Sequence, residues 1–200
     1  IKQIYNHHKG RLGYRRITLA IKQKGIIVNH KTVLRLMKIL GLKSLIRIKK
    51  YKSYKGEQGK IAPNILQRNF KAANPNEKWA TDVTEFNVSG NKLYLSPIID
   101  LFNVEIISYE LSERPNFNQI TNMLKKSFKR IPNNTNLILH SDQGWQYQMK
   151  QYQTLLKEKG LVQSMSRKGN CLDNAIIENF FGILKSELFY IMKFRDINHL

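Results

Sequence analysis

Residues 79–111, with the sequence WATDVTEFNVSGNKLYLSPIIDLFNVEIISYEL, decide the fold class of this chain. Three runs in this stretch, at 79–86, 92–99 and 104–111, are rich in the apolar, β-branched and aromatic residues that favour strands. The segment 89–91 (SGN) is a turn signal between the first two runs. The stretch therefore predicts three consecutive β-strands that open a sheet.

Helices and strands alternate after this stretch. The apolar pattern predicts, in order, a helix over 118–130, a strand over 136–140, a helix over 150–159, a strand over 162–166 and a helix over 173–190. Three strands followed by this alternation, βββαβαβα, are typical of a mixed sheet flanked by helices, which is an α/β fold.

Two short helices are predicted ahead of the sheet, within residues 1–43. The apolar residues of the first helix share one face and are Ile17, Ala20 and Ile21. Gly25 breaks this helix, Asn29 is a suitable N-cap for the second, and Gly41 ends the second. A Gly-containing turn between two short helices indicates a helical hairpin of the helix-turn-helix kind.

The second of these helices carries two stripes. Its apolar stripe comprises Val33, Leu36, Met37 and Leu40, and its basic stripe comprises Lys31, Arg35 and Lys38. A cationic stripe on the second helix of such a pair predicts a DNA-binding helix-turn-helix. The alternative is a helical hairpin with a solvated basic face.

The chain is strongly basic, and the charge is uneven. Its 200 residues include 34 Lys and Arg against 14 Asp and Glu, which gives a formal net charge of +20. Residues 1–60 hold 17 of the basic residues and one acid, Glu57. Such a surplus attracts polyanions, of which nucleic acid is the commonest, although a ribosomal-type protein or a membrane-surface binder would share it. The basic residues of 43–60 are interleaved with Tyr51 and Tyr54, and predict a linker along phosphates or a plain tether.

Cysteine content and hydropathy exclude several classes of protein. Cys171 is the only cysteine, which rules out an intrachain disulfide and a zinc finger with paired cysteines. No apolar run approaches the roughly 18 residues that a membrane span needs, and no stretch has the pattern of a secretory signal. We therefore expect a cytoplasmic, nucleoid-associated protein with no membrane partner.

Three carboxylates are candidates for chemistry. Asp82 lies within the first predicted strand, Asp142 lies in the turn that follows strand 136–140, and Glu178 lies about one turn into the last helix. If the two strands are neighbours and the helix packs beside them, the three acids converge and require cations between them. Oxygen ligands suit Mg²⁺ or Mn²⁺, and two such ions can hold the attacking and leaving oxygens of a phosphodiester. Taken singly, the acids also fit a buried ion-pair partner, a turn residue and a helix-face acid.

The spacing and context of these acids resemble a known family, the transposases of bacterial insertion sequences with a retroviral-integrase-like (DDE) core. Between Asp82 and Asp142 stand 59 residues, and between Asp142 and Glu178 stand 35, which is the family's spacing for its second Asp and its Glu. Motifs similar to those of the core are KWATDVT (78–84), HSDQG (140–144), GNCLDNA (169–175), ENFF (178–181) and LK (184–185). Motifs similar to those of the upstream helix-turn-helix are GYRRI (13–17) and RLM (35–37).

The resemblance implies an RNase H-like mixed sheet flanked by helices, preceded by a small helix-turn-helix domain. It implies that Asp82, Asp142 and Glu178 are catalytic and hold two Mg²⁺ or Mn²⁺ ions. Lys185, seven residues after Glu178, stands where the family has a basic residue that contacts element-end DNA, although a solvated lysine would share this spacing. The expected DNA-binding residues are therefore Arg15, Arg16, Lys31, Arg35, Lys38 and Lys185.

The expected domains are a helix-turn-helix domain with a basic tail over 1–58, a linker over 59–74, and an integrase-like core over 75–200 that is truncated at its C-terminus. The expected function is binding of the element's terminal repeats, followed by metal-dependent strand cleavage and strand transfer. The expected partners are element and target DNA, further copies of the chain on that DNA, and an upstream element-encoded protein. The alternatives are a nuclease that cuts without joining and a non-enzymatic, DNA-binding remnant of a decayed element.

Four other residues near these motifs have simpler interpretations. Asp173 is predicted to be the N-cap of the last helix, and His140 to be a structural hydrogen-bonding residue. Trp145 and Tyr147 are suited either to stacking on an unpaired base or to packing in a loop or core. The family more often has a small residue at the position of Trp145.

Overall fold

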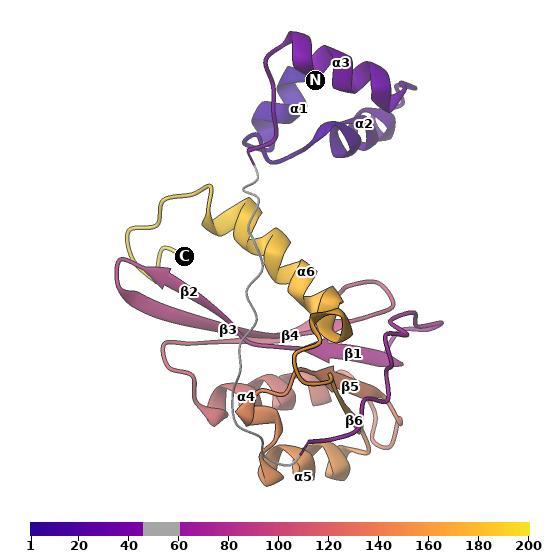
Figure 1. Cartoon of the computed structure of the whole chain (residues 1–200), viewed down its shortest axis with the longest axis vertical. Coiled ribbons are helices and arrows are strands. Elements are labelled where there is room, and N and C mark those ends of the chain that lie inside the picture. The colour runs from indigo at the N-terminus through magenta and orange to yellow at the C-terminus, as the bar shows by residue number, and fades with distance from the viewer. Residues whose placement is uncertain (46–60) are drawn as a thin grey trace. The chain divides into compact units, whose positions relative to one another are not determined.

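The computed structural model describes residues 1–45 and 61–200, apart from the side chain of Cys171 (Figure 1). The chain divides into two units, one formed by residues 1–50 and 184–193 and the other by residues 51–183 and 194–200. Most of the basic tail, and the first two residues of the predicted linker, lie outside the described residues. Each unit is described below by itself.

The N-terminal unit begins with three helices, α1 (Lys2–His7), α2 (Tyr14–Gln23) and α3 (His30–Ile39). Their buried apolar residues form one core and are Ile4, Ile17, Ile21, Val33 and Met37. The side chain of Asn29 accepts a hydrogen bond from the backbone N–H of Lys31 (2.8 Å), which confirms the predicted N-cap. The predicted apolar stripe of α3 is narrower than expected, since Leu40 is exposed.

The second unit is built on a mixed six-stranded sheet. Its strands are β1 (Lys78–Thr81), β2 (Thr84–Val88), β3 (Asn91–Asp100), β4 (Ile106–Ser112), β5 (Ile138–Ser141) and β6 (Val162–Met165). The long strand β3 pairs antiparallel with β1 and β2 along one edge and with β4 along the other. β1, β5 and β6 then follow one another in parallel.

The single strand expected over 79–86 is two strands, so this prediction was wrong in that detail. Thr81 pairs with Ile98, and Thr84 pairs with Leu95, which sets Asp82 opposite Pro97 when the register is continued. Proline has no N–H to donate to a ladder. Asp82 instead accepts the N–H of Val83 on its own carboxylate (2.7 Å), and the element order becomes ββββαβαβα.

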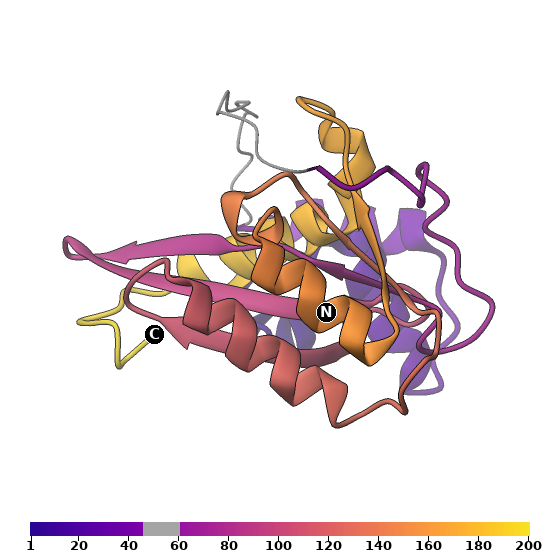
Figure 2. The same ribbon diagram turned by 90° about the horizontal axis from the view of Figure 1, so that it is seen from below.

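Helices cover both faces of the sheet. The helices α4 (Phe117–Phe128) and α5 (Lys150–Lys159) lie on one face, and α6 (Ala175–Leu184) lies on the other (Figures 1 and 2). The helix expected over 173–190 is thus shorter and is flanked by a 3-10 turn, η2 (Cys171–Asn174), and a π-helical turn, η3 (Lys185–Phe189). A further 3-10 turn, η1 (Trp145–Tyr147), precedes α5.

The alternation of side chains along each strand fills two cores. Trp79 and Ile98 point into the core shared with α4 and α5, whereas Ala80 and Ile99 point into the core shared with α6. Leu66, from the predicted linker, is also buried in the second core. The expectation of a mixed α/β sheet flanked by helices is confirmed. In the described parts of the chain, no helix has the length and apolar character that crossing a bilayer requires.

Candidate active site

The parallel pairing of β1 and β5 brings two of the candidate acids to one edge of the sheet. Ala80 lies beside His140 in the register of these strands. Continuing that register by two residues sets Asp82 beside Asp142, just beyond the end of each strand. The carboxyl ends of parallel strands are where α/β proteins commonly place their sites.

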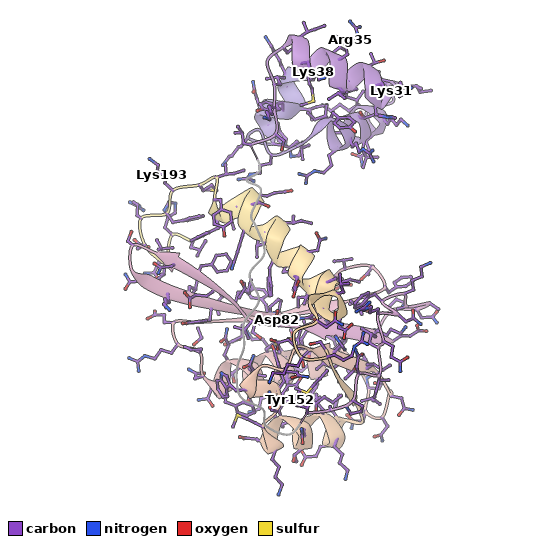
Figure 3. The ribbon with its side chains drawn as sticks, in the orientation of Figure 1. Lys31, Arg35, Lys38, Asp82, Tyr152 and Lys193 are labelled. Atoms are coloured by element: carbon purple, nitrogen blue, oxygen red, sulfur yellow. The ribbon has the colours of Figure 1, made fainter. Side chains whose placement is uncertain are left out.

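Asp82, which is labelled in Figure 3, is half-buried. It is contacted from the segment that precedes α6. Its Oδ2 accepts a long hydrogen bond from Nδ2 of Asn174 (3.4 Å). Asn174 is the last residue of η2 and is 4% exposed. The amide oxygen of Asn174, Oδ1, is buried and has no hydrogen-bond partner among the described residues. Asn174 therefore connects the β1 acid to the helix that carries Glu178.

Asp142 is half-buried in a tight turn. Its Oδ1 accepts the backbone N–H of Gly144 (2.8 Å). A Cβ atom at Gly144 would lie 2.9 Å from this oxygen and 2.6 Å from Nε2 of Gln146, so only glycine leaves both side chains in place. Burial raises the pKa of the Asp142 carboxyl, although the Gly144 N–H opposes this effect. A nearby cation would favour the charged form that burial disfavours.

Glu178 lies one turn into α6. The residue as a whole is exposed, but partial shielding of its carboxyl raises the pKa of Glu178, and the negative charge of Asp142 raises it further. The two acids are therefore close enough to repel each other. In the part of the chain that is described, however, no three His, Cys, Asp or Glu side chains form a group around one metal position. The continued register relates Asp82 to Asp142, and the charge of Asp142 acts on Glu178, but the described acids do not form a closed triad.

Two buried tyrosines lie beneath these acids. The rings of Tyr147 and Tyr152 are fully buried, and they meet edge to face with their centroids 5.3 Å apart. Burial, and then the charges of Asp82 and Asp142, raise the pKa of Tyr147 well above its usual value. Its hydroxyl approaches Thr81, but neither tyrosine hydroxyl meets a described partner with hydrogen-bond geometry. Both phenols are thus neutral, and Tyr147 packs in the core rather than stacking on a base.

Asp173 is not the N-cap of the last helix, and that prediction was wrong. It lies inside η2, before α6 begins, and its side chain is fully buried. The carboxylate accepts hydrogen bonds from five donors, which are Nδ2 of Asn64 (2.9 Å), Nε of Arg68 (2.8 Å), and the backbone N (3.1 Å), Nε (2.8 Å) and Nη2 (2.9 Å) of Arg167. The guanidinium of Arg167, joined by that of Arg68, holds the pKa of this carboxyl far below its usual range.

His140 also holds η2. Its Nε2 donates to the backbone carbonyl of Asp173 (2.8 Å), which leaves Nδ1 to accept from the hydroxyl of Ser164 (2.9 Å). Burial lowers the pKa of His140, and the ring is neutral. The expected structural role of His140 is confirmed. Because Asp173 is fixed from both sides, Asn174 and the first turn of α6 are fixed as well.

The basic stripe of α3 is exposed. Lys31, Arg35 and Lys38 lie on one face of the helix, away from the buried Val33 and Met37 (Figure 3). The spacing of i, i+4 and i+7 accounts for this arrangement.

The other three candidate DNA-binding residues differ in their surroundings. Arg15 and Arg16 are exposed in the first turn of α2, where Nε of Arg15 donates to the hydroxyl of Tyr14 (3.0 Å). Nη2 of Arg16 donates to the carbonyl of Arg11 (2.9 Å). Lys185 is half-buried and is the first residue of η3, where the helix changes from α to π.

Reasoning from the sequence missed three residues that shape the site. Asn174 stands four residues before Glu178, and this helical spacing was a usable signal. Arg167 stands six residues before Asp173. Arg68 had no local signal, because 105 positions separate it from the Asp173 that it contacts.

Comparison with known proteins agrees with this architecture. A family model described as the integrase core domain matches residues 72–171, and a model described as an HTH-like domain matches residues 1–50. The chain is 60% identical over 200 residues to transposase InsK for insertion sequence element IS150 of Escherichia coli K12, covering 100% of this chain and 71% of InsK. It is 57% identical over 175 residues to a transposase-like protein of Haemophilus influenzae, covering 88% of this chain and 81% of that protein.

A solved structure supports the fold. The chain is similar to a chain of the simian T-cell lymphotropic virus intasome in complex with the PP2A regulatory subunit B56 gamma, with a TM-score of 0.51 and 17% identity. The match covers 94% of this chain and 59% of that one. The likeness identifies the sheet and its helices as an RNase H-like fold of the integrase type. Together with the two family models and the close relatives, it means that this chain belongs to the DDE-type transposases of bacterial insertion sequences, which combine an HTH-like domain with an integrase core.

Proposed function

We propose that Asp82, Asp142 and Glu178 hold two divalent ions, Mg²⁺ or Mn²⁺, and that the core uses this site to cut and join DNA strands. The observation that carries the proposal is the parallel register of β1 and β5, which runs on to set Asp82 beside Asp142. The negative charge of Asp142 raises the pKa of Glu178, which supports including Glu178 as the third acid of the site.

The chemistry of these side chains fits such ions. All three offer oxygen ligands, which hard divalent cations prefer. The pKa values of Asp142 and Glu178 are raised, and a cation relieves both the burial of Asp142 and its repulsion of Glu178. Two ions held by Asp82, Asp142 and Glu178 would not require all three acids around one point. This agrees with the arrangement of the described acids, which do not form a closed triad.

The surrounding residues orient the acids. Gly144 fixes one oxygen of Asp142 through its backbone N–H, and Asn174 approaches Asp82 from the side of α6. The phenol of Tyr147 is buried within reach of the charges of Asp82 and Asp142, and because it is neutral it adds no charge to the site. When bound, the ions supply Lewis-acid activation of the attacking oxygen and stabilisation of the leaving oxygen.

The reaction needs two phosphodiester exchanges. In the first, water adds across a phosphodiester at the element end and releases a 3′-OH. In the second, that hydroxyl attacks a phosphodiester of the target and displaces its 3′ oxygen, so that one P–O bond forms as another breaks. No covalent bond to the protein is required, and no Ser or Tyr nucleophile is assigned. The chain acts in the cytoplasm on nucleoid DNA.

The helices of the N-terminal unit bind the terminal repeats. Lys31, Arg35 and Lys38 present three cations on one exposed face of α3, the helix that corresponds to the recognition helix of a helix-turn-helix. Arg15 and Arg16 add charge at the start of α2, although Arg16 also pairs with Glu187. Lys185 is a further contact to element-end DNA. Further copies of the chain on the same DNA bring the two element ends together.

A strand-transfer assay tests the proposal. The full chain is incubated with element-end duplex, target DNA and Mg²⁺ or Mn²⁺, and both nicks and joined products are measured. Asp82→Ala, Asp142→Ala and Glu178→Ala should each bind DNA but neither cut nor join. The matched control is Glu158→Ala, since Glu158 is an exposed acid on α5 and should leave both steps unchanged.

Each other outcome rejects part of the proposal. Normal cutting by Asp142→Ala would show that the acids are wrongly assigned. Nicks without joined product from the wild-type chain would identify a nuclease. Binding without nicks, in either metal, would identify a DNA-binding remnant.

A further inference from the structure

A cavity of about 200 Å³ lies beside the candidate acids and has no part in the metal chemistry proposed above. The lining residues that matter here are Val83, Glu85, Tyr94, Asn116, Trp145 and Gln146. Val83 directly follows Asp82, and Trp145 and Gln146 follow Asp142 by three and four residues. One wall of the cavity is therefore continuous with the chain segments that carry both acids.

Trp145 is an unusual wall residue because 54% of it is exposed. It begins η1, whose last residue, Tyr147, is fully buried. The backbone of Tyr147 is held at both ends, since its N–H donates to the carbonyl of Gly144 (3.0 Å) and its carbonyl accepts from Nε2 of Gln163 (2.8 Å). A large aromatic side chain is thus presented to solvent on a turn that is fixed from below.

The remaining lining combines hydrogen-bonding groups of both kinds. Asn116 lines the cavity and caps α4 by accepting the N–H of Gln119 on its Oδ1 (3.0 Å), so that its Nδ2 remains as a donor group. Among the described residues, none hydrogen-bonds the side-chain amide of Gln146. Glu85 adds a carboxylate that pairs with Lys92. Amides that offer a donor and an acceptor together match the edge of a nucleobase, and an aromatic ring matches its face.

We propose that this cavity takes one unstacked nucleobase of the DNA strand held at the acids, with Trp145 stacking on its face and Gln146 hydrogen-bonding its edge. The volume admits a single base and excludes a base pair. The inference rests on the proposed cutting site, because the base belongs to a nucleotide next to the phosphate bound there. The acids lie at the edge of the sheet. Extruding the base next to the cut allows the phosphate of a duplex to approach them more closely.

The two tryptophans of the chain provide a direct measurement. Trp79 is fully buried in the core, and Trp145 is exposed, so that Trp79→Phe leaves a chain whose indole fluorescence comes from Trp145 alone. This variant is titrated with an element-end duplex in the presence of Ca²⁺, a hard divalent ion that takes the same oxygen ligands. The titration is repeated with duplexes that carry one abasic site at each position within two nucleotides of the cut. Stacking should quench Trp145, and removing one particular base should abolish the quenching.

Binding affinity provides the second measurement, in the otherwise unchanged chain. Removing that base should weaken binding by about tenfold in the wild type and have no further effect in Trp145→Ala. Trp145→Phe should recover part of the loss, and Gln146→Ala should change which base is preferred. The matched control is Tyr109→Ala, because Tyr109 is equally exposed on β4 but does not line the cavity.

The failure of this inference is distinguishable from failure of the proposed function. If no abasic position alters the quenching, or if Trp145→Ala responds to base removal as the wild type does, the cavity does not take a base. Metal-dependent cutting by the wild type would still stand in that case. Quenching by free nucleotides to the same extent as by the duplex would also overturn the assignment to the held strand.

Discussion

Replacing Asp173 with asparagine tests how the segment before α6 is held. Oδ1 of Asp173 accepts Nε of Arg68 and Nη2 of Arg167, and Oδ2 accepts Nδ2 of Asn64 together with the backbone N and Nε of Arg167. Asparagine keeps the shape but turns one oxygen into an NH₂ group. Whichever way the amide faces, it confronts at least two donors with another donor. At least two charge-assisted hydrogen bonds are therefore lost.

The size of the loss follows from the exposure of the partners. A hydrogen bond to a charged group contributes about 1.5–3 kcal/mol when both partners stay out of water. The side chains of Arg68 and Arg167 are 43% and 59% exposed, so both guanidinium groups turn to water in the variant and recover part of this energy. We expect the free energy of unfolding to fall by about 2–3 kcal/mol. Loss of a helix cap alone would cost about 1 kcal/mol.

The pH dependence has a defined sign. The arginines lower the pKa of Asp173 in the folded state, so its carboxylate stabilises the fold fully above the unfolded pKa, which is about 3.9. That stabilisation is lost as the pH falls below this value toward the lowered pKa. The difference in stability between wild type and Asp173→Asn should be constant between about pH 5 and pH 7 and shrink below about pH 4.

Urea unfolding at pH 7 and at pH 3, followed by far-UV circular dichroism, measures both effects. The control is Glu105→Gln, because Glu105 pairs with Arg130 where both side chains are about half exposed, and its loss should change little. A change of less than about 0.5 kcal/mol at pH 7 would refute the reasoning, since two charge-assisted bonds contribute more. A difference that persists in full at pH 3 would equally refute it.

Three further predictions concern the site and the basic helix. Gly144→Ala should slow cutting by at least about tenfold with little change in melting temperature. The reason is that the added Cβ would displace the carboxylate of Asp142 and the amide of Gln146. A wild-type cutting rate would contradict this prediction. Asp142→Asn should stabilise the metal-free chain at neutral pH, because burial raises the pKa of the Asp142 carboxyl. The melting temperature of the wild type should fall as the pH rises from the pKa of the unfolded chain to the raised pKa of the folded chain. A variant that melts below the wild type at every pH would reject this prediction. Arg35→Ala should reduce discrimination between element-end and random DNA in salt titrations, and unchanged discrimination would remove Arg35 from the interface.

Local patterns predicted most elements of the fold. The alternation from β4 to α6 was readable because each strand is short and apolar and each helix is amphipathic. The break in the strand after Thr81 could not be predicted from the local pattern. It depends on Pro97, which comes to lie opposite Asp82 only when β3 pairs with β1. Helix α1 was missed as well, since it has neither a capping side chain at Ile1 nor a hydrophobic stripe, with Ile4 as its single buried residue.

The pairing of the acids was only partly predictable. The 60-position offset between Asp82 and Asp142 equals the offset between Ala80 and His140 in the parallel register, but no sequence pattern states that β1 and β5 are neighbours. The family resemblance supplied that step. Asp173 was misassigned because an acid near the start of a helix usually caps it, whereas its real partners include Arg68 from a distant segment.

Three buried polar groups without described partners lie near the acids, and a carboxylate with many partners, that of Asp173, lies next to one of them in the chain. Tyr147, Tyr152 and Asn174 each bury a side-chain oxygen without a described hydrogen-bond partner, which costs stability. Asp173 stands next to Asn174 in the chain and accepts five hydrogen bonds, which stabilises the same segment. A site that contains repelling carboxylates and unpaired phenols needs a rigid support. The strongly held Asp173 provides that support, because it fixes η2, which carries Asn174, and the start of α6, which carries Glu178.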